Sequence, residues 1–149
     1  MQLSTRGRYA VMAMVDLAMR QTLGCECGPI CLAEIAARQK LSQAYLEQLF
    51  GKLRRAGLVA SARGPGGGYR LARSSEAMTI ADIVAAVDKS NQAARCRGSE
   101  PGCQSHDLWE ELDRQIQTFL EGVTLADVVA GRVPGSAAPS DNGRRLAAE

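Results

Sequence analysis

The sequence has 149 residues, 46% of them hydrophobic, and a formal net charge of +2. This length can bury one sizeable core with an appended arm and excludes two independent domains. Asp16 and Arg20 interrupt the apolar run near the N-terminus, which therefore falls short of the roughly 20 apolar residues of a membrane span. The odd number of cysteines, five, is typical of a reducing compartment. We expect a cytoplasmic protein with no membrane partner.

Charge is divided unevenly along the chain. Residues 1–73 carry 11 Lys and Arg against 4 Asp and Glu, net +7, whereas residues 74–149 carry 7 against 12, net −5. A polyanion would bind the basic half. An ordinary solvated surface can be equally basic. The order of the elements therefore has to decide between a polyanion-binding surface and an ordinary solvated one.

Three helices are predicted in the basic half. Apolar residues recur at spacings of three and four over 8–22, after Ser4 or Thr5 as N-cap, and again over 30–40, a pattern typical of amphipathic helices. Ser42 caps a third helix that ends at Gly57. Its inward positions are Leu46, Leu49, Phe50 and Leu53. Two short helices in succession, the second opened by a Ser cap, predict a helix-turn-helix.

The segment "LVASARGPGGGYRLA" (58–72) follows the third helix at once. Its two short apolar runs around a Gly/Pro turn predict a β-hairpin, the wing of a winged helix. A phosphate-binding loop is disfavoured because no Lys-Ser/Thr follows the last glycine and a strand, not a helix, comes next. The fold class is therefore mainly α with a small β-hairpin wing.

Residues 78–88 form the next expected helix, with Thr79 as N-cap and Asp82 at its third position. A long helix is predicted from about Ser105 and a short one from Thr124. The long helix carries an apolar stripe: Leu108, Trp109, Leu112, Ile116, Phe119, Leu120 and Val123. On an arm beyond a small domain, such a stripe predicts packing against a second copy, with ordinary core packing as the alternative.

Three regions are therefore expected. Residues 1–77 form a winged helix-turn-helix DNA-binding region, and residues 78–131 form a loop with the dimerisation helices. Residues 132–149 are rich in Pro, Gly, Ser and Ala without periodicity, which predicts a disordered tail.

The third helix offers side chains suited to reading DNA. Gln48 can bond an adenine edge and Glu47 can accept from cytosine N4, while the cations and Tyr45 would meet phosphates. Arg63, beside Gly64 and Pro65 at the wing tip, can enter a minor groove. The expected exposed face consists of Ser42, Gln43, Tyr45, Glu47, Gln48, Lys52, Arg54 and Arg55. A winged helix used for protein contacts is the alternative, which the basic charge disfavours.

Three stretches carry a family resemblance: "STRGRYAVMAMVDLA", "SQAYLEQLFGKLRRAGLVASARGPGGGYRLA" and "MTIADIVAAVD". Over roughly residues 1–130 the chain resembles the Rrf-type winged-helix transcription regulators, most closely the iron-sulfur cluster regulators among them. The resemblance implies a homodimer on a palindromic double-stranded operator. It also implies DNA-reading positions at Ser42, Tyr45, Glu47 and Gln48, and at Arg63, Gly64 and Pro65. Ala44 replaces a DNA-reading serine of these regulators, so a different operator preference is expected.

The resemblance also implies a [2Fe-2S] cluster. These regulators hold it with three cysteines and a histidine; here Cys96 matches the first cysteine, Cys103 and His106 match the C-x-x-H, and the middle cysteine is missing. The fourth ligand would be a carboxylate such as Glu100 or Asp107, a side chain of a partner subunit, or a small thiol. A cluster without a fourth ligand is the remaining alternative. Zinc accepts the same donors, and a thiol switch without a cluster is the other alternative.

The remaining cysteines, Cys25, Cys27 and Cys31, lie between the first two predicted helices. We interpret Cys31 as a small buried side chain and the other two as incidental exposed thiols, with a supplementary sensing role as the alternative. No arrangement of nucleophile, base and orienting group is visible, so an enzyme is not expected. The expected function is a DNA-binding transcription regulator, a repressor, that senses iron-sulfur or redox status through the cluster; a cluster-free regulator that responds through thiol oxidation or zinc is the alternative.

Overall fold

The computed structural model describes residues 4–22, 28–88 and 104–134, with the side chains of 104–106 left out. The N-terminal half contains three helices and a hairpin: α1 (Thr5–Thr22), α2 (Leu32–Gln39), α3 (Gln43–Arg55), β1 (Val59–Ala62) and β2 (Gly68–Leu71). A 3-10 turn, η1 (Ser75–Ala77), leads to α4 (Ile80–Val87), α5 (Gln104–Gly122) and α6 (Leu125–Val129). The mainly helical fold with a two-stranded hairpin agrees with the predicted winged helix-turn-helix.

Helix caps are where the sequence predicted them. Ser4 Oγ accepts from the Gly7 amide at 3.0 Å at the start of α1, and Ser42 Oγ accepts from the Tyr45 amide at 3.2 Å at the start of α3. Thr79 begins α4 with a capping box that includes Asp82. Each cap satisfies amides that have no partner within the helix.

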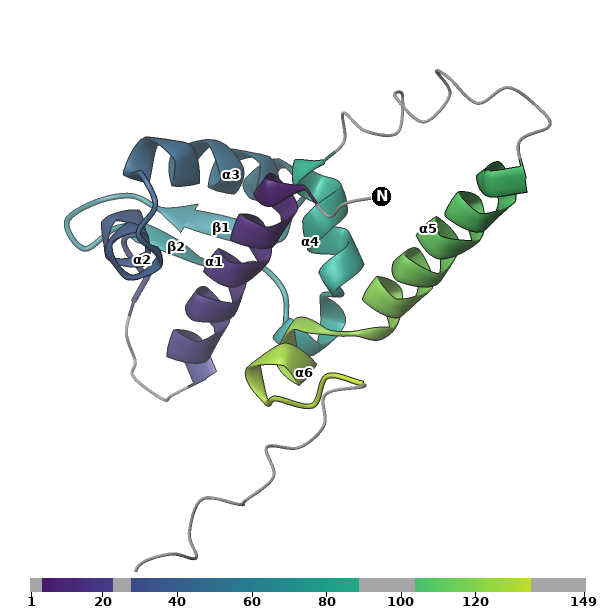
Figure 1. The fold of residues 1–149 in the computed structure, drawn as a ribbon. Coiled ribbons are helices and arrows are strands. Elements are labelled where there is room, and N and C mark those ends of the chain that lie inside the picture. Colours follow the sequence, from purple (N-terminus) through teal and green to yellow (C-terminus); the bar gives the residue numbers. More distant parts are fainter. Residues whose placement is uncertain (1–3, 23–27, 89–103, 135–149) are drawn as a thin grey trace, which may run out of the picture.

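Within the described residues, a hydrophobic core joins elements from both halves of the chain. It packs Met14 and Leu17 of α1, Phe50 of α3 and Ile83 of α4 against Leu125 of α6. The inward face predicted for α3, Leu46, Leu49, Phe50 and Leu53, is buried. Figure 1 shows α1 at the centre, with α2, α3 and the hairpin on one side and α4 and α6 on the other.

The hairpin is tied to the helix-turn-helix by an extra strand-like pairing. In the antiparallel register Val59 pairs with Leu71 and Ala62 with Gly68, and Ile30 forms an isolated bridge with Tyr69. Because Ile30 is used in this bridge, α2 begins at Leu32, two residues later than the predicted helix. A Cβ on Gly68 would lie 2.2 Å from the Ile30 carbonyl oxygen, so only glycine permits this close approach.

Cys31 is exposed, and the interpretation as a buried side chain is wrong. The residue is the N-cap of α2, with extended backbone. The buried face of α2 starts one residue later and consists of Leu32, Ile35 and Ala36. A cap residue lies outside the helical periodicity, which is why the apolar pattern misplaced this thiol.

The joint between α5 and α6 fixes the root of the long helix. Ile80 N donates to Val123 O at 2.9 Å, and Leu125 N donates to Met78 O at 2.8 Å. Thr124 caps α6 through a capping box with Asp127. Hydrogen bonds from Thr124 hold the pKa of Asp127 below its usual value, with the Arg132 guanidinium adding to the effect. The C-terminal end of the long helix is thus attached to the segment that leads into α4.

No helix in the described ranges has both the length and the apolar composition needed to cross a membrane.

Candidate nucleic-acid interface

The second helix of the helix-turn-helix, α3, presents a mostly polar face to solvent. The N-cap Ser42 is exposed, and so are Gln43, Ala44, Glu47, Gln48, Arg54 and Arg55 of the helix. The turn before it is tight, since Lys40, the C-cap of α2, has a φ of 53°. The opposite face of α3 is anchored in the core, so these polar groups are held on a rigid helix.

Glu47 has a partner within its own helix. Gln43 Nε2 donates to Glu47 Oε1 at 3.1 Å, and both side chains are exposed. The pair lies four residues apart, on neighbouring turns. The second carboxylate oxygen stays available to accept a hydrogen bond, which is what a cytosine amino group would require.

Tyr45 and Lys52 are less exposed than the sequence predicted. Tyr45 is half-buried and packs edge to face on Tyr9, with ring centroids 6.1 Å apart. Lys52 is also half-buried, and its ammonium donates to the Val87 carbonyl oxygen at 3.1 Å. Helical spacing assigned both residues to the outer face because it contains no information about α1 or α4.

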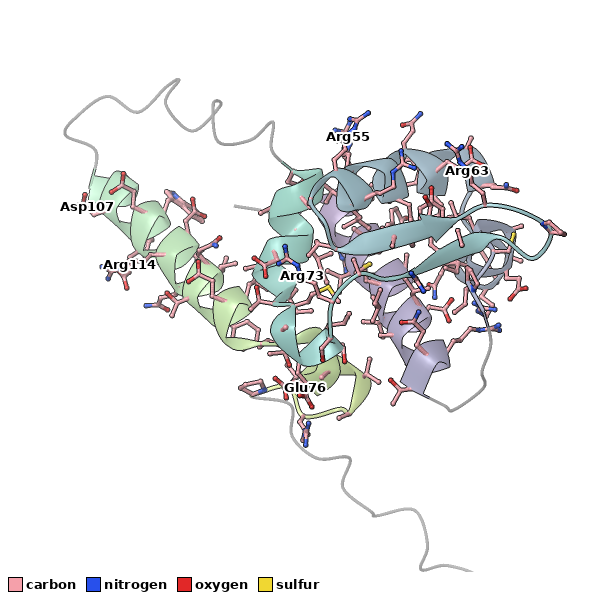
Figure 2. The ribbon with its side chains drawn as sticks, turned by 180° about the vertical axis from the view of Figure 1, so that it is seen from behind. Arg55, Arg63, Arg73, Glu76, Asp107 and Arg114 are labelled. Carbon is pink, nitrogen blue, oxygen red and sulfur yellow. The ribbon has the colours of Figure 1, made fainter. Side chains whose placement is uncertain are left out.

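The wing carries an exposed basic turn. Arg63, Gly64 and Pro65 are all exposed between β1 and β2. Gly64 and Gly66 have φ values of 111° and 79°, which glycine adopts without strain. Arg54 of α3 donates to Ser61 Oγ of β1 at 3.3 Å, so helix and wing are connected. Figure 2 shows Arg55 and Arg63 pointing outward along the same edge of the molecule.

Two arginines of the basic half are paired with carboxylates at the surface between α1 and α2. Arg38 bonds Asp16 at 2.9 Å, and Arg20 bonds Glu34, also at 2.9 Å. These pairs brace α1 against α2. Charge counting alone could not separate these paired cations from the exposed ones on α3 and the wing.

The apolar stripe of α5 is largely uncovered within one chain. Leu108 is 63% exposed, Trp109 54% and Phe119 46%. The stripe ends in the core of the same chain, where Leu120 packs and Val123 is buried. Figure 1 shows α5 as an arm that leaves the body at α6. Asp107 and Arg114 point away from the body (Figure 2).

The predicted cluster ligands are mostly outside the described residues. Cys96, Glu100 and Cys103 lie in 89–103, and Cys25 and Cys27 lie in 23–27. His106 belongs to the first turn of α5, but its side chain is outside the description, whereas Asp107 is exposed there. Among residues 4–22, 28–88 and 104–134, no group of three His, Cys, Asp or Glu could hold a metal. The ligand set therefore remains a prediction.

A helix-turn-helix with an exposed polar second helix and a basic wing defines the winged-helix DNA-binding transcription regulators. Residues 3–131 match the Rrf2 family, described as iron-dependent transcriptional regulators. The chain belongs to this Rrf2 family.

Curated relatives support the same class. The chain is 51% identical over 136 residues to a putative HTH-type transcriptional regulator of Azotobacter vinelandii, covering 87% of this chain and 80% of the relative. It is 47% identical over 135 residues to the HTH-type transcriptional regulator IscR of Yersinia enterocolitica, covering 87% and 79%.

Solved structures are similar over most of the chain. IscR of T. potens superposes with a TM-score of 0.72 at 37% identity, covering 93% of each chain. CymR, the global cysteine regulator of B. subtilis, superposes with a TM-score of 0.73 at 33% identity, covering 88% of this chain and 98% of CymR. The protein is thus a DNA-binding transcription regulator similar to IscR and CymR.

Proposed function

We propose that this regulator binds a palindromic operator as a homodimer and senses iron-sulfur status through a [2Fe-2S] cluster on Cys96, Cys103 and His106. Residues 1–77 read DNA, and residues 78–131 supply the cluster loop and the dimer interface. In this proposal, the cluster-bound form represses genes for iron-sulfur cluster assembly, as the resemblance to IscR implies. The single observation that supports the DNA-reading part best is the exposed polar face of α3 beside the basic wing.

Base reading is assigned to Gln48 and Glu47, and backbone positioning to the cations. Gln48 and Glu47 are exposed on adjacent positions of α3, and their side chains match the adenine and cytosine edges in the major groove. Arg54 and Arg63 contact phosphates or the minor groove. Ser42 and Tyr45 contribute backbone contacts at the start of the helix, and Gly64 and Pro65 let the wing approach the sugar-phosphate chain.

The dimer is supported by the exposed stripe on α5. Two large aromatic side chains, Trp109 and Phe119, are about half exposed in the single chain, and large contiguous apolar surfaces of soluble proteins are normally covered by a partner. An isologous two-fold contact between two α5 stripes buries the same residues on both protomers. It also gives the two-fold symmetry that a palindromic operator requires.

The donor set fits a cluster in its chemistry. Thiolates and imidazole are both established ligands of [2Fe-2S] iron, and imidazole raises the potential relative to thiolate. Such a cluster supplies a redox-sensitive group, which Cys96, Cys103 and His106 would hold. Glu100 is the first candidate for the fourth position because a carboxylate is the remaining ligand type within the loop.

The missing middle cysteine favours a second candidate function. The two cysteines in 89–103 are sufficient for a thiol switch. Together with His106 and a carboxylate of the loop, they also supply the four donors of a zinc site. The regulator would then respond to thiol oxidation while reading DNA in the same way.

Anaerobic purification with iron, acid-labile sulfide and zinc analysis separates the two candidates. We expect brown protein with equal iron and sulfide, and loss of colour in Cys96→Ala and in Cys103→Ala. Cys31→Ala, which removes an exposed thiol elsewhere, is the matched control and should keep the colour. Glu100→Ala should lose it only if this carboxylate is a ligand. Protein that stays colourless after reconstitution would refute the cluster and leave the thiol or zinc candidate.

A further inference from the structure

Side chains of two other helices hold the C-terminal end of α4. Ser4 Oγ, at the start of α1, donates to Asp88 Oδ1 at 2.6 Å. Lys52 Nζ, on α3, donates to the Val87 carbonyl oxygen at 3.1 Å. Two adjacent residues at the end of α4 are therefore linked to α1 and to the recognition helix. The sequence did not indicate either contact.

The contact with α1 is close and electrostatically favourable. A Cβ at Gly7 would lie 3.2 Å from Asp88 Oδ2 and 3.4 Å from Val84 Cγ1, so the two helices meet without an intervening side chain. Ser4 Oγ also accepts from the Gly7 amide. The Asp88 carboxylate thus lies at the N-terminal end of α1, where the helix dipole favours an anion.

The contact with α3 is favourable for the complementary reason. Val87 is the last residue of α4, and its carbonyl has no acceptor role within the helix. The ammonium of Lys52 supplies a donor and a positive charge at this negative end. The bond is partly buried, which weakens screening by solvent.

These contacts lie between the two parts of the molecule that a sensor must connect. Asp88 is followed directly by 89–103, the segment that contains Cys96 and Cys103. Lys52 lies four residues after Gln48 and therefore on the same side of α3. A displacement of the end of α4 would thus act on α3 one turn from a proposed base-reading side chain.

We propose that Lys52 and Ser4 are positioning residues that transmit the state of the cysteine loop to the DNA-reading half. The inference rests on the proposed function, because it requires a loop with two states. Lys52 carries a displacement of Val87 to α3, and Ser4 carries a displacement of Asp88 to the start of α1. A ligand on the loop changes DNA affinity only through contacts that differ between its states, and these two contacts supply that difference.

The test uses Lys52→Met in the full chain, which keeps the aliphatic stem and removes the ammonium. Arg55→Met is the matched control, since it removes one positive charge from the same helix and its side chain points outward (Figure 2). The dissociation constant for operator DNA is measured with cluster-loaded and with cluster-free protein. Iron and sulfide are determined for each variant, so that only equally loaded samples are compared.

Wild-type protein should show a ratio of the two dissociation constants within the range of about 5 to 150 that is typical of allosteric coupling. Arg55→Met should weaken binding in both states and preserve the ratio, whereas Lys52→Met should lower the ratio, because one of the two transmitting contacts is lost. Ser4→Ala, a second variant outside α3 and the wing, should also lower the ratio.

Hydrogen exchange gives a readout without DNA. Amides of α3 should exchange differently in loaded and cluster-free wild type, and this difference should vanish in Lys52→Met while any difference in 89–103 persists. An unchanged ratio and an unchanged α3 difference in Lys52→Met would overturn the inference and leave the proposed function intact. A wild-type ratio of one would contradict both the sensing function and its transmission.

Discussion

Replacing Trp109 by alanine should dissociate the proposed dimer without unfolding the chain. Trp109 is 54% exposed, and a large aromatic side chain buries up to about 250 Å², so about 130 Å² is left to cover. At about 25 cal/mol per Å² this area is worth about 3 kcal/mol. A two-fold interface uses the residue twice. Since association costs offset part of the gain, we expect the dimer dissociation constant to rise at least about a hundredfold.

The assay is sedimentation over a dilution series, supported by tryptophan fluorescence. Trp109 is the only tryptophan of the sequence, so its emission in wild type should shift to longer wavelength as the dimer dissociates on dilution. Gln117→Ala, on the polar side of α5, is the control and should leave the dimer intact. A Trp109→Ala protein that dimerises as tightly as wild type would show that the α5 stripe is not the interface.

Three further predictions concern local interactions. Ser42→Ala should lower the free energy of unfolding by about 1 kcal/mol in urea titrations, because the N-cap bond of α3 is lost; an unchanged midpoint would contradict it. Gln43→Leu should change the preference for cytosine at the base read by Glu47, since its donor to that carboxylate is gone, and equal binding to a set of single-base operator variants would refute this. The pKa of Asp127 is lowered in the folded protein, so its carboxylate stabilises the fold at pH values above the usual carboxyl pKa, and this contribution is lost as pH falls. Wild type and Asp127→Asn should therefore differ in free energy of unfolding at neutral pH and converge in acid. A difference that stays constant with pH would exclude the capping role of the carboxylate.

Local chemistry explains why so much of the fold could be predicted from sequence. Ser42, Thr79 and Thr124 cap helices through atoms three residues away, and such short-range patterns are readable in the sequence itself. The hairpin was equally predictable, because glycines between two short apolar runs mark a turn in the sequence. In the structure, Gly64 and Gly66 of this turn have positive φ. The inward face of α3 followed from helical spacing alone.

Contacts between distant segments were not predictable. Ser4 and Asp88 are 84 positions apart, and Lys52 and Val87 are 35 apart, so no spacing rule relates them. Lys52 was assigned to the outer face because helical spacing does not indicate its contact with Val87. Cys31 was predicted to be buried because the apolar pattern does not mark it as a cap residue outside the helix. Ile30 lies before α2 and not within it, because it pairs with Tyr69 of the wing.

The candidate site also has a part that local sequence patterns predict and a part that they do not. The exposure of Glu47, Gln48 and Arg63 follows from helix periodicity and turn position. The metal ligands depended on family resemblance, since two cysteines and one histidine fit several metals equally well. The structure thus gives the exposure of the proposed DNA-reading side chains, whereas the cluster assignment depends on chemical analysis of the protein.

Titration of a fluorescent palindromic operator over a series of salt concentrations tests the central claim most directly. We expect two chains per duplex and an affinity that falls linearly, on logarithmic scales, as salt rises, because Lys and Arg side chains displace counterions from phosphates. Arg63→Ala should reduce the slope by about one. Binding of a single chain, or an affinity insensitive to salt, would contradict a dimeric winged-helix regulator that reads DNA through α3 and the wing.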